Sequence, residues 1–224
     1  MVGCPPLIRG RWRIFPVYGS TKNQPLNQPR RCSDVIYAGG MNTLLNLPAN
    51  IHPSRRLTLI VTAGHERERI TELIAALCLH GAFQVIAGSD WLPSYSLTRL
   101  LRHKTHEVRQ ALSHARMARA FTCYQLLDLI AGIANIPPDD EPLLILDFLN
   151  TFHNDDIPLP VRFRILRQCC GHLQRLAFRK PIIVFVQELP AEDYAAFQAI
   201  LADIADKVLH IEAEDERGFQ PGLF

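Results

Sequence analysis

The stretch "LTLIVTAGHERERITELIAALCLH", residues 57–80, contains a strand, a turn and a helix in sequence. Its first seven residues are an apolar, β-branched run, which is typical of a strand buried on both faces of a parallel sheet. After the turn, four apolar residues share one helix face: Ile70, Leu73, Ile74 and Leu77. The stretch therefore predicts a strand over 57–63 and a helix over 66–80 that stops at Gly81.

The same alternation continues to the end of the chain. Apolar runs predict further strands over 83–87, 118–122, 142–148, 181–187 and 207–213. Between them, helical patterns cover 94–112, 123–134, 159–178 and 191–205. Strands that alternate with helices of ten or more residues favour parallel pairing through right-handed crossovers. We therefore expect an α/β fold with a mostly parallel central sheet and helices on both faces.

Composition divides the chain into three parts. With 48% apolar and 21% charged residues, the 224-residue chain can bury one sizeable core. Residues 1–35 are basic and rich in proline, which disfavours helices and central strands. We expect this segment to be an N-terminal arm, 36–212 to be the α/β domain and 213–224 to be an acidic tail.

The chain lacks the marks of secretion and membrane insertion. Its first residues hold no apolar signal region, and no apolar run approaches eighteen residues, so we expect a cytoplasmic protein. Six cysteines occur without a C-x-x-C pair, mostly in apolar runs. This pattern favours reduced core thiols over disulfides, and we expect no metal site.

Two basic segments are candidates for contact with nucleic acid. From Met1 to Arg31 the chain has no acid, and its candidate cations are Arg9, Arg11, Arg13, Lys22, Arg30 and Arg31. A second segment has Glu107 as its only acid, and its candidate residues are Arg99, Arg102, Lys104 and Arg109. Basic blocks can follow a phosphate backbone, although each one alone also fits a solvated face.

Ligands in parallel sheets bind beyond the carboxyl ends of the strands, which directs attention to the turn after 57–63. A phosphate-binding P-loop reads G-x-x-x-x-G-K-[ST]. Aligned on Gly64, the chain keeps Thr71 but has Arg69 for the second glycine and Ile70 for the lysine. A non-glycine residue in the left-handed conformation costs about 1 to 2 kcal/mol, so Arg69 argues against a phosphate cradle.

The residues around this turn also bear on its charge. Ile70 fits the apolar face of the helix, which removes the cation from the site. Glu66 and Glu68 fall in the first helical turn, where the helix dipole favours carboxylates. We therefore expect the protein's own side chains to fill the anion position.

Two later strands end in polar residues. Asp147 follows four apolar residues in "LLILD", an arrangement that can hold Mg²⁺ and that can also cap the following turn. Gln187 ends "IIVFVQ", where it can contact a γ-phosphate or end the strand.

In the order and spacing of these segments, residues 35–212 resemble the RecA/RadA recombinase core. "LTLIVTAG" stands at the Walker A place, "LLILDFLNTF" at Walker B, and "IIVFVQ" ends in the family's glutamine. The resemblance implies an ATP site and contacts with DNA and with RecA-like subunits. The chain departs from the family at Arg69 and Ile70, and after the second strand it offers only Asp90 as the water-activating acid.

Two functions follow as expectations. The first is a catalytically degenerate RecA-like paralogue that acts as a DNA-binding or adaptor subunit in recombination or repair, with RecA-like partners and no cofactor. The second is an active or regulatory NTPase that uses ATP and Mg²⁺. In it Arg67 or Arg69 replaces the lysine, and three residues complete the site: Thr71 and Asp147 on Mg²⁺, and Gln187 on the γ-phosphate. A third function, an unrelated small-ligand enzyme, lacks a recognisable nucleophile or acid–base pair.

Overall fold

The computed structural model describes residues 35–37, 57–62, 66–137, 139–153, 156–188 and 192–211. All of them belong to one compact unit, Arg31–Phe224. The expected tail and nearly all of the expected arm lie outside the described residues. So do Gly64 and the six candidate cations of the arm, Arg9, Arg11, Arg13, Lys22, Arg30 and Arg31. The expectations for these residues stay predictions.

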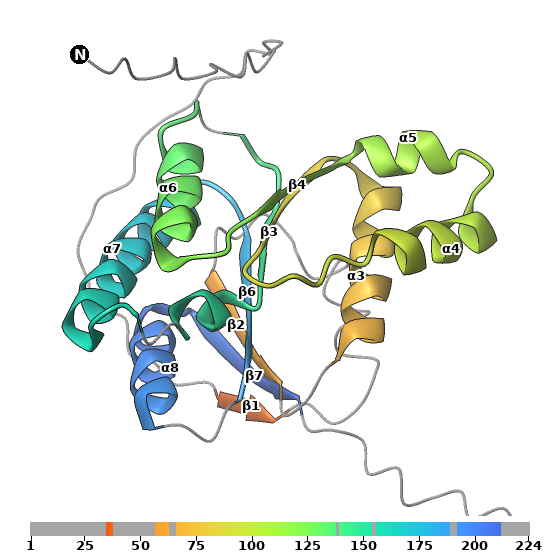
Figure 1. Ribbon diagram of the computed structural model, residues 1–224. Coiled ribbons are helices and arrows are strands. Elements are labelled where there is room, and N and C mark those ends of the chain that lie inside the picture. The colour runs from red at the N-terminus through yellow and green to blue at the C-terminus, as the bar shows by residue number, and fades with distance from the viewer. Residues whose placement is uncertain are drawn as a thin grey trace, which may run out of the picture. The chain divides into compact units, whose positions relative to one another are not determined.

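Within the described part of the chain, seven strands form one sheet in which every neighbouring pair is parallel (Figure 1). Their order across the sheet is β1-β7-β2-β6-β5-β3-β4. The strands are β1 (Val35–Tyr37), β2 (Leu57–Thr62), β3 (Phe83–Ala87), β4 (Ala115–Arg119), β5 (Leu143–Leu146), β6 (Ile182–Gln187) and β7 (Lys207–Ile211). The expected parallel sheet is confirmed.

Helices cover both faces of the sheet, as expected for an α/β fold (Figure 1). One face packs against α6 (Cys123–Ala134), α7 (Leu159–Ala177), α8 (Glu192–Ile204) and the 3₁₀ helix η1 (Phe148–Phe152). The other packs against α3 (Arg67–His80), α4 (Ser94–Lys104) and α5 (Val108–Ser113). Each face thus has its own apolar cluster, with the sheet between them.

The central strand β2 shows why its sequence is apolar throughout. Leu57, Leu59 and Val61 belong to the cluster beneath α7 and α8, whereas Ile60 belongs to the cluster beneath α3. Burial of each such side chain contributes about 1.5 to 3 kcal/mol. Alternate side chains of one strand therefore hold both helical layers to the sheet.

The described cysteines are free thiols within these clusters, as their apolar surroundings predicted. Cys78, Cys123, Cys169 and Cys170 are all buried. Burial raises the pKa of Cys78 to about 11 and that of Cys170 to about 12. These thiols therefore stay protonated at neutral pH, as expected of structural rather than reactive cysteines.

Two expected elements differ in the structure. The predicted helix 94–112 is divided into α4 and α5, because Thr105 is extended and its hydroxyl accepts a hydrogen bond from the Glu107 amide at 3.1 Å. The predicted strand 118–122 is shifted to Ala115–Arg119. It ends early because Thr122 caps α6 and draws the chain away from the sheet.

A third difference concerns the expected strand 142–148. It ends at Leu146, and the chain then turns into η1 through Asp147, which has φ 50° and ψ 41°. Asp147 is the only non-glycine residue with positive φ in the described part of the chain. Aspartate is one of the few side chains that tolerate this left-handed conformation.

Candidate functional site

A cavity of about 270 Å³ lies beyond the carboxyl ends of the central strands. It is lined by Arg67, Ser89, Asp90, Trp91, Asp147, Leu149, Asn150, Gln187 and Tyr194. This is the edge at which ligands bind in parallel sheets. Three of the candidate residues identified in the sequence, Arg67, Asp147 and Gln187, meet here.

Strand order explains why these three residues converge. Strand β6 lies between β2 and β5 and pairs with both of them. In its register Gln187 stands beside Thr62, at the end of β2. The residues that follow β2, β6 and β5 therefore share one edge, although more than a hundred residues separate Arg67 from Gln187.

Arg67, the first residue of α3, turns toward the loop that follows β3. Its guanidinium carbon lies 5.7 Å from the centre of the Trp91 ring. A cation over an indole face at this distance is held by a cation–π interaction. Arg67 therefore forms one wall of the cavity together with Trp91, a residue that the sequence analysis did not single out.

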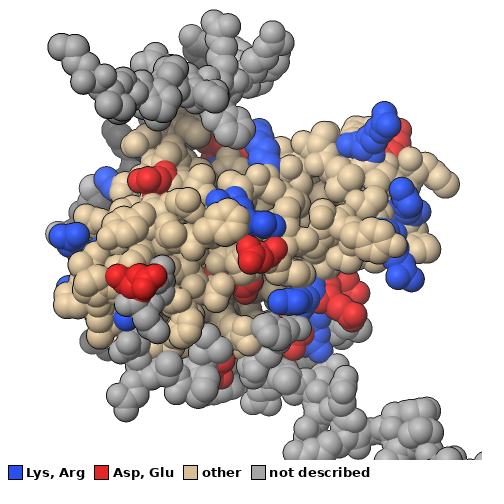
Figure 2. All heavy atoms as spheres, in the orientation of Figure 1, with Lys and Arg blue, Asp and Glu red and all other residues tan. Residues whose placement is uncertain are grey.

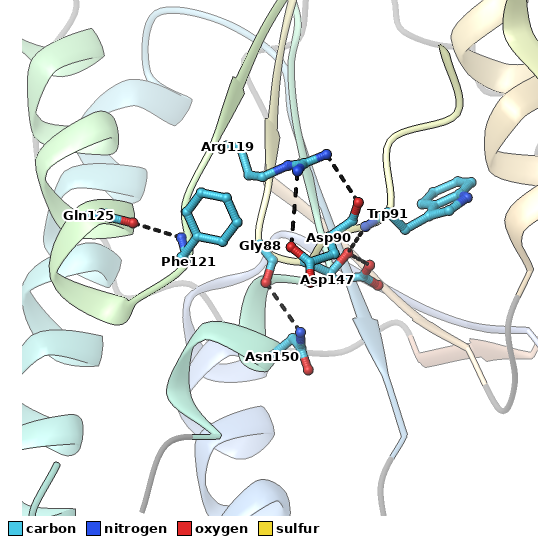
Figure 3. A network of polar contacts seen from close by, with 9 residues as sticks. Gly88, Asp90, Trp91, Arg119, Phe121, Gln125, Asp147 and Asn150 are labelled. Atoms are coloured by element: carbon cyan, nitrogen blue, oxygen red, sulfur yellow. Dashed lines mark hydrogen bonds and ion pairs between the residues drawn. The ribbon is translucent and has the colours of Figure 1, made fainter. Parts of the chain in front are cut away.

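Asp147 is oriented by the loop that follows the neighbouring strand β3 (Figure 3). The Ser89 hydroxyl donates a hydrogen bond to its Oδ2 at 2.5 Å, and the Trp91 amide donates to the Ser89 oxygen at 3.3 Å. Asp147 occupies the N-cap position of η1 but makes no side-chain capping bond. Its carboxylate therefore serves the cavity rather than the turn.

Gly88 permits the close approach of these two strand ends. A Cβ atom at this position would lie 2.4 Å from the carbonyl oxygen of Asp147 and 3.1 Å from the Thr151 side chain. The Gly88 amide donates to the Leu146 carbonyl at 2.8 Å, and its own carbonyl accepts from Asn150 Nδ2 at 3.3 Å. Only glycine fits between β3 and β5 at this point.

Tyr194 of α8 closes the far side of the cavity. Its ring is 4% exposed, and its hydroxyl donates to the Leu149 carbonyl at 3.0 Å. Burial, with a smaller contribution from the negative charge of Asp147, raises the pKa of Tyr194 to about 12. The phenol is thus a neutral hydrogen-bond donor at physiological pH.

Asp90 and Arg119 form a polar rim beside the cavity (Figure 3). Arg119 donates to the Asp90 carbonyl at 3.0 Å, and its other terminal nitrogen lies 4.0 Å from Asp90 Oδ1. The guanidinium of Arg119 also lies 5.6 Å from the centre of the Phe121 ring. Asp90, the only acid available after the second strand, is therefore directed toward an arginine.

Residues 67–71 of the expected P-loop frame are helical. Helix α3 begins at Arg67, and Ile70 is buried in the core, as predicted. Thr71 is 5% exposed, and its hydroxyl donates to the Arg67 carbonyl at 2.7 Å. Arg69 pairs through Nε with Glu66 at 3.2 Å. Neither Arg69 nor Thr71 lines the cavity.

The acids at the start of α3 do not cap it. Glu66 occupies the N-cap position without a side-chain capping hydrogen bond and pairs with Arg69 instead, while Glu68 is exposed. Both acids do stand at the start of α3, and the expectation that they fill the anion position stays a prediction.

The second basic segment lies away from the cavity. Arg99, Arg102 and Lys104 are on α4 and Arg109 is on α5, and all four are exposed. Figure 2 shows Lys and Arg side chains over this part of the molecule. None of the four makes an ion pair or hydrogen bond with the described residues.

Four polar or aromatic residues of the cavity carried no clear signal in the sequence. Ser89 and Trp91 follow the end of β3, and Asn150 follows β5, so a search of every strand end could have found them. Tyr194 lies within helix α8, far along the chain from the ends of β3 and β5. Its contribution depends on packing between distant segments.

Among the described residues, no group of three or more His, Cys, Asp or Glu side chains is placed to hold a metal ion. None of the described helices is both long and apolar enough to cross a membrane.

Comparison with protein-family models and with curated proteins finds no match to this sequence. The family relationship therefore stays a proposal that rests on strand order and on the residues at the sheet edge.

Proposed function

We propose that this protein is a catalytically degenerate RecA-like paralogue of the cytoplasm, a DNA-binding or adaptor subunit in recombination or repair. The observation that carries the proposal is the start of α3 at Arg67. A P-loop wraps backbone amides around phosphates through a glycine-rich loop before its helix begins. Here residues 67–71, the second half of that frame, are already helical.

Strand order and the surviving polar positions support the RecA-like part of the proposal. The strands at the Walker A and Walker B places, β2 and β5, flank the strand that ends in Gln187. Asp147 and Gln187 line one cavity, and this convergence supports the proposal. Such an arrangement is consistent with a nucleotide-binding fold that has kept its framework.

The cavity itself supports the loss of ATP turnover. Arg67 and Trp91 stack within it, and Ile70 is withdrawn into the core, which leaves no lysine at the phosphate position. We therefore expect the residues that remain to maintain the fold and a binding surface rather than to hydrolyse ATP.

A pull-down from the native host, scored by mass spectrometry for RecA-like subunits, tests the adaptor role. We expect at least one such subunit to co-purify, and we expect purified protein to release no phosphate from ATP above background. Phosphate release that disappears in the Asp147→Ala variant would contradict the proposal.

A second function has one observation in its favour. Arg67 turns into the cavity that Asp147 and Gln187 line, so a cation, a carboxylate and an amide converge as an NTPase would need. In this alternative Arg67 replaces the lysine, and Asp147 holds Mg²⁺. Arginine is a planar, bulky cation and a poor substitute for lysine, and Thr71 is engaged within α3, so we place this function second.

A further inference from the structure

The outward face of α4 carries an aromatic side chain and two arginines in a row. Tyr95, Arg99 and Arg102 follow one another at i, i+4 and i+7 along this helix. Residues with this spacing lie on one face, because 3.6 residues make a turn. We call Tyr95, Arg99 and Arg102 the α4 stripe.

The helix holds the α4 stripe toward solvent. Leu97 and Leu101, on the opposite side of α4, are buried in the cluster beneath α3. Tyr95 is 82% exposed, which is the largest value among the exposed large apolar side chains of the described residues. The Tyr95 ring is therefore accessible to a ligand.

The stripe lies in a field of uncompensated positive charge. Lys104 ends the same helix and Arg109 lies on α5, with Glu107 as the only acid from 94 to 113. Some arginines elsewhere on the described surface have an acidic neighbour, as Arg116 has Glu141 and Arg119 has Asp90. The cations on α4 and α5 have no partner of this kind among the described residues.

We propose that the α4 stripe is a binding surface for single-stranded nucleic acid. A base stacks on the Tyr95 ring, and Arg99 and Arg102 pair with the phosphates on either side of it. Proteins that bind single strands combine exposed aromatic rings with a positively charged track in this way. A duplex keeps its bases stacked inside, so it offers the arginines its phosphates but offers Tyr95 no base.

This inference deepens the DNA-binding part of the proposed function and names the surface and the form of the ligand. The α4 stripe does not line the cavity. Only the loop that precedes α4 does so. Nor does it require the adaptor role, because a surface of this chemistry binds single strands in any pathway.

The test is a fluorescence-anisotropy titration of the full-length protein with a labelled twenty-nucleotide oligothymidine and with a duplex of equal length. It is repeated at several salt concentrations. We expect tighter binding of the single strand, and we expect Tyr95→Ala to weaken it about tenfold while Tyr95→Phe binds as the wild type does. Tyr95→Ala should leave the weaker duplex binding unchanged.

The arginines of the α4 stripe are tested separately, through the salt dependence of binding. For single strands, the slope of log K against log salt is about −0.7 for each phosphate neutralised, so the Arg99→Ala/Arg102→Ala variant should flatten the slope by about 1.4. Arg164 and Arg167 are exposed on α7 at the same i, i+3 spacing and provide the matched control. Their double alanine variant should bind as the wild type does.

Three results would overturn the inference, and each has a different meaning. If the wild type binds no nucleic acid, the DNA-binding part of the proposed function fails as well. If the wild type binds but the stripe variants match the α7 control, binding lies elsewhere and only this inference fails. If the arginine variant weakens binding, Tyr95→Ala does not, and polyglutamate competes equally well, the surface recognises an acidic polypeptide instead.

Discussion

The Ser89 hydroxyl donates a hydrogen bond to Asp147 Oδ2 at 2.5 Å, although 58 residues separate them in the chain. This bond joins the loop after β3 to the turn after β5, and it directs the carboxylate into the cavity rather than onto η1. The orientation of the Asp147 carboxylate therefore depends on β3 and β5 being neighbours, because the segments that follow these two strands supply the two partners of the bond.

Gly88→Ala should destabilise the protein, because the added Cβ would meet the Asp147 carbonyl at 2.4 Å. Overpacking of this kind costs about 1 to 3 kcal/mol of unfolding free energy, measured by urea denaturation. Gly132→Ala is the control, because nothing lies within 4 Å of its Cβ position. Within helix α6 that change should stabilise the protein by about 0.5 to 1 kcal/mol. Equal stability of the two variants would contradict the described contact.

The Arg67–Trp91 pair should give a measurable coupling. A double-mutant cycle with Arg67→Ala and Trp91→Ala isolates the interaction between the two side chains. For a cation–π contact at the surface we expect a coupling free energy of about 0.5 to 1 kcal/mol in urea unfolding. A coupling indistinguishable from zero would mean that Arg67 does not rest on the indole in solution.

At the amino ends of the strands, away from the cavity, Lys180 is 3% exposed and forms an ion pair with Asp139. Gln84 Nε2 also donates to Asp139, at 3.1 Å. Lys180→Met removes the cation, and Asp139 retains some exposure, so we expect a loss of about 2 to 3 kcal/mol in urea denaturation. Lys180→Met/Asp139→Asn should recover part of this loss. A single variant as stable as the wild type would show that the pair contributes nothing.

The raised pKa of Tyr194 makes the stability of the protein depend on pH in the alkaline range. Its pKa is raised to about 12 from the ordinary value of 10, so its contribution to stability is fully present below pH 10 and is lost as pH rises through 12. Tyr194→Phe lacks both the hydrogen bond to Leu149 and the titration. We expect the wild type to be more stable by about 1 kcal/mol at pH 8, with the difference shrinking between pH 10 and pH 12. A difference that stays constant over this range would contradict the described burial.

Much of the fold could be predicted from the sequence, because hydrophobic periodicity is a local property. The strand Phe83–Ala87 and the helix Cys123–Ala134 agree residue for residue with the predicted 83–87 and 123–134. The break between α4 and α5 was missed because a single Thr105 hydroxyl, through its bond to the Glu107 amide, interrupts an otherwise helical pattern.

The site was only partly predictable, because its geometry depends on long-range contacts. Arg67, Asp147 and Gln187 could be identified since each follows or ends an apolar strand. The roles of Gly88 and Ser89 are visible only once β3 and β5 are known to be neighbours. Thr71 matched a motif by spacing alone, yet helix α3 already includes it and its hydroxyl bonds to the Arg67 carbonyl.

The most direct test of the central claim is isothermal titration calorimetry of the full-length protein with Mg-ATP. A degenerate phosphate site predicts no heat of binding at micromolar to submillimolar nucleotide, for the wild type and for Asp147→Ala alike. Micromolar binding by the wild type that is abolished in Asp147→Ala would contradict the account and favour the NTPase alternative.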